Sequence, residues 1–170
     1  MNTVVKLTQG YSAEEDRLFL DAQLADAEPQ RLWLTQRLTG VLVRHLCDWL
    51  DQHLAQTASG HHDHRLHSFE QQSALAALQP DAAVAPGRHE CRVDSIDLDR
   101  GSQAIRLSFK PADLANGVSC MTLDATQLRQ WLAILHELYG KAGWPTTVWP
   151  VWMSAPQRPA GAPVSTVQLH

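Results

Sequence analysis

The sequence predicts an α+β fold in which antiparallel strands form a sheet and helices pack against one face of it. The prediction rests on segments of alternating apolar residues, on amphipathic segments with apolar residues three or four positions apart, and on turn residues between them. A strand–strand–strand–helix order occurs twice, so we expect one domain over residues 1–142 with halves at about 1–57 and 91–141.

The first half contains three predicted strands and a long helix. The strand segments are residues 4–11, 17–24 and 30–35. Thr35 is the predicted N-cap of a helix that ends at 57–60, where Ser-Gly supplies a stop signal. Leu42 and Leu46 lie on the apolar face of this helix, so we expect both to be buried against the sheet.

The second half repeats this order after a connection. The connection consists of a His-rich segment, a short helix and a linker rich in Pro, Ala and Gly, at residues 61–67, 66–78 and 80–87. The strand segments that follow are residues 91–98, 103–110 and 118–123. Asp124 is the predicted N-cap of a helix over 125–141, whose apolar face includes Trp131 and Leu135.

The two halves overlay without gaps at an offset of 89 residues. The matching pairs are Val4 with Val93, Leu7 with Ile96, Leu20 with Phe109, Leu32 with Met121, Leu34 with Leu123, Leu42 with Trp131, Leu46 with Leu135, and Leu50 with Tyr139. Two interpretations stay open at this point. One is internal duplication of a strand–strand–strand–helix unit, and the other is that two similar units share their periodicity by chance.

The last segment, 143–170, differs from the rest because it is rich in Trp and Pro. Its tryptophans, Trp144, Trp149 and Trp152, are the predicted partner-binding residues, since Trp is enriched at interface hot spots. The alternative is that this segment folds back and completes the core of its own domain. From Pro156 to His170 the composition is rich in Ala, Pro, Gly and Ser, which predicts a mobile end.

A histidine cluster is the candidate metal site. His61, His62, His64 and His67 lie within seven residues, and imidazole is a common ligand of zinc and nickel. The alternative is a solvated loop that is rich in His. A closed zinc site normally has four ligands at recognisable spacings, which this segment lacks, so the sequence predicts no bound cofactor.

Composition and motifs exclude several classes of function. The 170-residue chain has a formal net charge of −4 and no basic run, which disfavours nucleic acid and anionic membranes as partners. Its three separated cysteines fit neither a disulfide framework nor a metal knuckle, and no signal peptide is evident, so we expect a cytoplasmic protein. Asp94, Asp97 and Asp99 form either a weak cation site or a solvent-facing strand edge.

No motif of a known catalytic type is present in the sequence, so no catalytic residue is assigned. The function that the sequence favours is a non-enzymatic accessory or adaptor protein that acts through protein–protein contacts, with a homodimer as one form. The competing hypothesis is a metal-binding protein or a metal-dependent enzyme that uses the segment His61–His67.

Overall fold

The computed structural model describes residues 1–57, 64–79, 81–113, 115, 117–154 and 167–168. Its longer strands and its α-helices are β1 (Asn2–Ser12), β2 (Arg17–Leu24), β3 (Gln30–Leu34), α1 (Gln36–Thr57), α2 (His64–Ala76), β4 (His89–Arg100), β5 (Ala104–Pro111), β6 (Ser119–Asp124) and α3 (Ala125–Ala142). Two 3-10 turns, η2 (Thr146–Val148) and η3 (Val151–Ser154), and the short strand β7 (Val167–Gln168) follow α3.

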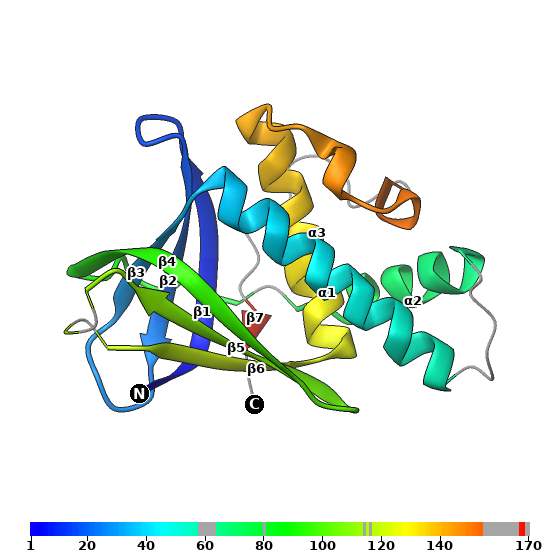
Figure 1. Cartoon of the computed structure of the whole chain (residues 1–170), viewed down its shortest axis with the longest axis horizontal. Helices are drawn as coiled ribbons and strands as arrows, with labels where there is room; N and C mark the ends of the chain where they lie inside the picture. The colour runs from blue at the N-terminus through cyan, green and yellow to red at the C-terminus, as the bar shows by residue number, and fades with distance from the viewer. Residues whose placement is uncertain (58–63, 80, 114, 116, 155–166, 169–170) are drawn as a thin grey trace.

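The six longer strands close into a barrel (Figure 1). Strands β1 to β3 form one antiparallel triplet, and β4 to β6 form another. Parallel pairs join the triplets at both seams, β3 with β4 and β6 with β1. The prediction of an open antiparallel sheet with helices on one face is therefore wrong, because the sheet is mixed and closed.

The closure has a physical cause that the local pattern does not reveal. Short turns specify the pairs within a triplet, whereas pairing between triplets is long-range. The connection from β3 to β4 contains α1 and α2, and a connection of this length permits the parallel pairing that a hairpin turn forbids. Each triplet has one apolar face, and closure buries both faces at once: Leu20, Leu34, Leu107 and Leu123 are at most 1% exposed.

The first strand of each triplet contains a bulge at the same place. The register of β1 with β2 shifts between Val4 and Lys6, and that of β4 with β5 shifts between Val93 and Ser95. An extra residue reverses the inward–outward alternation, so Val4 and Leu7, three positions apart, are both buried. The two bulges are separated by the predicted offset, since 93 − 4 = 89.

The gap-free overlay is wrong for the middle strand of each triplet. Leu18 pairs with Leu34, and Ile105 pairs with Leu123. The third strands keep the predicted offset, since 123 − 34 = 89, but the middle strands differ by 105 − 18 = 87. The residue equivalent to Leu20 is therefore at position 107, two before the one predicted. The cause is the turns beside the middle strand, which differ in length between the triplets.

Both long helices begin at their predicted caps. Thr35 Oγ1 accepts a hydrogen bond from Leu38 N at 3.3 Å, and Asp124 Oδ1 accepts one from Gln127 N at 2.8 Å. The Gln127 side chain accepts from Asp124 N in return, which completes a capping box. The predicted buried residues of these two helices are confirmed, each being at most 3% exposed: Leu42, Leu46, Trp131 and Leu135.

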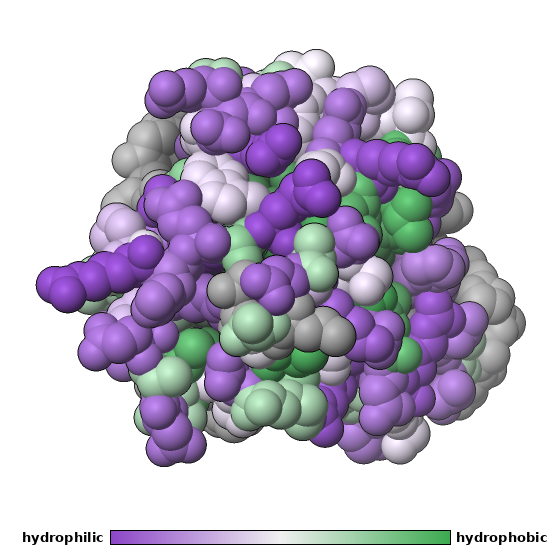
Figure 2. Space-filling view, turned by 60° about the vertical axis from the view of Figure 1, so that its left-hand side comes forward, coloured by the Kyte–Doolittle hydropathy of each residue, from purple (hydrophilic) through white to green (hydrophobic). Residues whose placement is uncertain are grey.

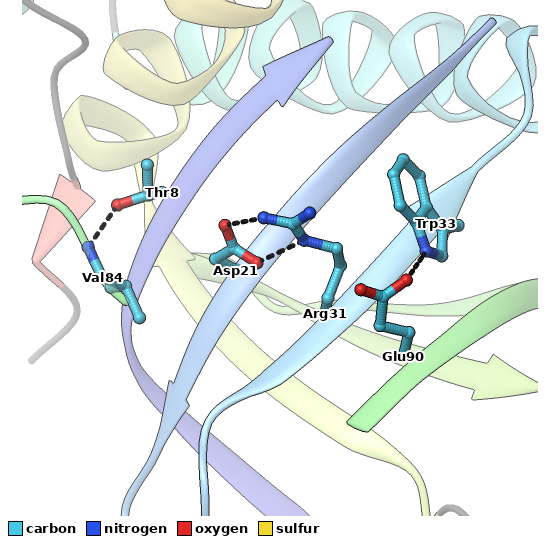
Figure 3. Close-up of polar contacts among 6 residues, drawn as sticks. All are labelled: Thr8, Asp21, Arg31, Trp33, Val84 and Glu90. Atoms are coloured by element: carbon cyan, nitrogen blue, oxygen red, sulfur yellow. Dashed lines mark hydrogen bonds and ion pairs between the residues drawn. The ribbon is translucent and has the colours of Figure 1, made fainter. Parts of the chain in front are cut away.

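The linker before β4 lies against the outside of the barrel (Figure 3). Val84 N donates to Thr8 Oγ1 on β1 at 2.8 Å. Beside it, Arg31 donates to both carboxylate oxygens of Asp21, at 2.7 and 2.8 Å. Gly87 passes so close to β3 that a Cβ on it would lie 2.5 Å from a backbone carbon of that strand, so a side chain does not fit there. Thr8, Asp21 and Arg31 on this face are thus already paired.

The barrel side of the molecule exposes little continuous apolar area. Figure 2 shows hydrophilic residues over most of this side, with hydrophobic residues only in small separate areas. Among the described residues, the exposed large hydrophobic side chains are Met1, Val41, Phe69 and Val151. Three of these belong to α1, α2 and η3. No helix within the described ranges is both long and apolar enough to cross a membrane.

Candidate binding groove

The segment that follows α3 packs onto the helices and becomes part of the core. Trp144, Trp149 and Trp152 are between 3% and 8% exposed. The Tyr139 ring on α3 makes edge contacts with the rings of Trp144 and Trp149, at centroid distances of 5.2 and 5.3 Å. The predicted partner-binding indoles therefore lie inside the chain's own core, while Val151 between them is 79% exposed. Whether a partner touches this segment stays a prediction.

A groove of about 530 Å³ opens where this segment meets the first half of α1. This volume lies in the range of ligand-binding clefts, about 300–1,000 Å³. The groove exceeds the cavity of about 360 Å³ at the end of the barrel. One wall is α1, and the other is α3 with the chain that follows it. The lining residues are Gln36, Arg37, Gly40, Val41 and Arg44 on one wall, and Tyr139, Pro145 and Val148 on the other.

The hydroxyl of Tyr139 is a polar group in this groove that no described residue pairs with. Tyr139 is 1% exposed, and its hydroxyl has no hydrogen-bond partner among the described residues. Burial raises its pKa to about 12, and the nearby charge of Arg44 opposes that rise only in part. The phenol is therefore protonated at neutral pH and is available as a donor. Leaving such a group unpaired costs about 1–3 kcal/mol, so a ligand acceptor at this point would be stabilising.

Gly40 on α1 lies close to this hydroxyl. Its backbone has none of the positive φ values that favour glycine, which among the described glycines occur at positions 117 and 143. A Cβ at Gly40 would lie 3.7 Å from Tyr139 Oη and 3.7 Å from Val148 Cγ1, which is ordinary contact. Glycine inside a helix destabilises by about 0.5–1 kcal/mol relative to alanine. The fold therefore does not require glycine here.

The charge of the groove is positive. Arg37 and Arg44 are exposed, and neither forms an ion pair within the described part of the chain. No carboxylate is among the described lining residues. Val41 lies between the two arginines on the same helix and is 38% exposed. A ligand of this groove thus meets two guanidiniums, one phenol donor and an aliphatic surface.

The predicted histidine cluster is described only in part. His61 and His62 lie outside the described residues, and His64 begins α2, with its side chain also outside the description. His67 is 4% exposed. Within the described ranges, no group of three or more His, Cys, Asp or Glu side chains is arranged to hold a metal ion.

His67 belongs to a buried network that ties α2 to the other helices. Arg129 NH2 lies 3.3 Å from His67 Nδ1; because arginine only donates, Nδ1 is the acceptor, and Nε2 carries the hydrogen. That Nε2 faces Asp51 Oδ1 at 3.2 Å. The Trp152 ring stacks on His67 with 4.9 Å between centroids, and the Arg129 guanidinium lies 5.3 Å from the same indole. Both ring nitrogens are engaged, so the geometry gives His67 a structural role.

The cysteines and the aspartates of β4, the other candidate site residues, also have structural roles. Cys47, Cys91 and Cys120 are free and buried. Burial, with smaller effects from nearby carboxylates, raises the pKa of Cys47 to about 12, and burial also raises the pKa of Cys91. Neither thiol supplies a thiolate nucleophile at neutral pH. Asp94 and Asp97 form exposed ion pairs with Arg92 and Lys110 on the barrel surface, as the solvent-facing interpretation expects.

The residues of the groove are ones that the sequence patterns did not single out. The available signal was Gly40, an isolated glycine within a strongly amphipathic helix, with Arg37, Val41 and Arg44 around it. An isolated glycine in a helix often has a packing or functional reason. The second wall was not predictable, because Tyr139 reaches α1 only through the tertiary packing of α3.

Comparison of this chain with models of known protein families, with curated proteins and with solved structures finds no match.

Proposed function

We propose that this chain is a non-enzymatic accessory protein that binds a partner protein in the groove between α1 and the segment after α3. The observation that carries the proposal is the pairing of Gly40 with the unpartnered Tyr139 hydroxyl. The glycine lowers helix stability, and the hydroxyl lacks an acceptor among the described residues, yet both belong to the same groove. Features that cost stability without helping the fold are typical of binding sites.

Protein is the favoured class of partner because the groove is open and continues onto exposed α1. Val41 lies in the groove and on the helix surface, so a segment seated there would extend along the helix. The lining holds no described acid or base of the kind that general acid–base catalysis uses near neutral pH, since the Tyr139 pKa is about 12. A binding role is therefore favoured over a catalytic one.

Site-specific photo-cross-linking in the native cells tests this proposal. With benzoylphenylalanine in place of Val41, we expect adducts of discrete mass. In the Arg44→Glu background their yield should fall by at least about fivefold, because charge-assisted hydrogen bonds are lost. Arg92→Glu is the matched control, since Arg92 is an exposed arginine on β4 away from the groove lining, and it should leave the yield unchanged.

The masses of the adducts identify the partner class. An adduct at twice the mass of the chain identifies a second copy, the homodimeric form of the proposal. Diffuse labelling, or adducts equally strong in the Arg44→Glu and Arg92→Glu backgrounds, would show that this groove is not a protein-binding site.

A further inference from the structure

The groove's two arginines are spaced for two separate anionic groups. Arg37 and Arg44 are seven residues apart on α1, which is about 10 Å along a helix axis. A phosphate concentrates its charge in one group and is best held by donors that converge on one point. Two arginines whose backbone positions are this far apart along one helix instead match two monoanions carried on one chain, such as neighbouring carboxylate side chains.

The surface between the arginines is apolar. Val41 lies between them in sequence, and Pro145 and Val148 line the opposite wall. An aliphatic side chain that lies between two carboxylates would bury area against these residues, at about 25 cal/mol per Å². The Tyr139 hydroxyl lies close to Gly40 at the groove floor and has no hydrogen-bond partner among the described residues, so it has a hydrogen to donate to an acceptor on a ligand.

From this arrangement we infer that the groove recognises a partner segment in which acidic residues alternate with aliphatic residues. The inference rests on the proposed function and specifies the chemistry of the partner. One carboxylate is held by Arg44 together with the Tyr139 hydroxyl, a second by Arg37, and the aliphatic side chain between them packs on Val41. An acidic partner also fits the charge of the groove. The chain has a formal net charge of −4, yet Arg37 and Arg44 form no ion pair with a described residue.

Fluorescence anisotropy with labelled synthetic peptides tests the inference on the full-length protein. The probe is Gly-Ser-Glu-Leu-Glu-Leu-Glu-Ser-Gly. One comparison peptide has glutamine in place of each glutamate, and another has phosphoserine there. We expect the glutamate peptide to bind at least about tenfold more tightly than the glutamine peptide, because charged hydrogen bonds are the stronger ones. We also expect its affinity to fall as salt rises.

Three variants of the protein show whether the peptide binds in the groove. Arg44→Gln and Tyr139→Phe should each weaken binding of the glutamate peptide, whereas the control Arg92→Gln should leave it unchanged. Equal binding of the glutamine peptide, or unchanged binding to Arg44→Gln, would overturn the inference. Tighter binding of the phosphoserine peptide would overturn the choice of carboxylate. If no peptide binds while the Val41 cross-link still captures a partner, the inference fails and the proposed function stands.

Discussion

Truncation after Lys141 is expected to abolish the cooperative unfolding transition of this protein. The deletion removes three indoles that are at most 8% exposed, and Met153, which is fully buried. Loss of one buried tryptophan costs about 3–5 kcal/mol, while a whole domain has a stability of about 5–15 kcal/mol. Removing three at once therefore costs about as much free energy as stabilises a whole domain, so the helices should no longer pack stably on the barrel.

Truncation after Ser154 is the matched control. It keeps all three indoles and removes, besides the chain outside the description, the strand β7, which pairs with β1 at two positions and also contacts α3. Thermal denaturation followed by circular dichroism should give a midpoint close to that of the full chain. The same midpoint for both truncations would contradict the burial of Trp144, Trp149 and Trp152 in the core.

Trp131→Ala is expected to be the most destabilising of the single core substitutions. Trp131 is 1% exposed, and its backbone carbonyl accepts a hydrogen bond from the Gln9 side chain on β1 at 3.1 Å, so α3 is fixed to the barrel at this point. Replacing a buried tryptophan with alanine removes apolar contact and leaves a cavity, with an expected loss of about 3–5 kcal/mol.

The Trp131→Phe variant shows how much of the loss comes from ring packing and how much from the indole N–H group. The indole Nε1 of Trp131 has no hydrogen-bond partner among the described residues, so its loss removes no described bond. The phenylalanine variant should lose only about 1–2 kcal/mol, because most of the ring volume is kept. Urea denaturation measures both values, and an unchanged midpoint for Trp131→Ala would show that this face of α3 is assigned wrongly.

The sequence was sufficient to predict local elements because local chemistry determines them. Thr35 and Asp124 cap the helices as predicted, and the predicted core residues Leu42, Leu46, Trp131 and Leu135 are buried. In β4 the bulge beside Val93 shifts the inward face by one residue, so the apolar residues of this strand do not alternate strictly.

Features that depend on long-range pairing were not predictable from the sequence. Parallel pairing of β3 with β4 and of β6 with β1 closes the barrel, and neither pair is joined by a short turn. Of the segment Pro156–His170, which is predicted to be mobile, Val167 and Gln168 pair with β1, and the other residues lie outside the described ones. The candidate groove belongs to this class as well, since its two walls come from helices about a hundred residues apart in sequence.

The central claim is that position 40 is glycine because partner binding needs an open groove, and not because the fold needs glycine. Gly40→Ala tests this claim most directly. Gly140 on α3 has open space around its Cβ position, so Gly140→Ala is the matched control for helix propensity. The account predicts that Gly40→Ala raises stability by about 0.5–1 kcal/mol and sharply reduces the cross-link from position 41. The control should leave the cross-link intact. A Gly40→Ala protein with an undiminished cross-link, or with lower stability than the unmodified chain, would contradict the account.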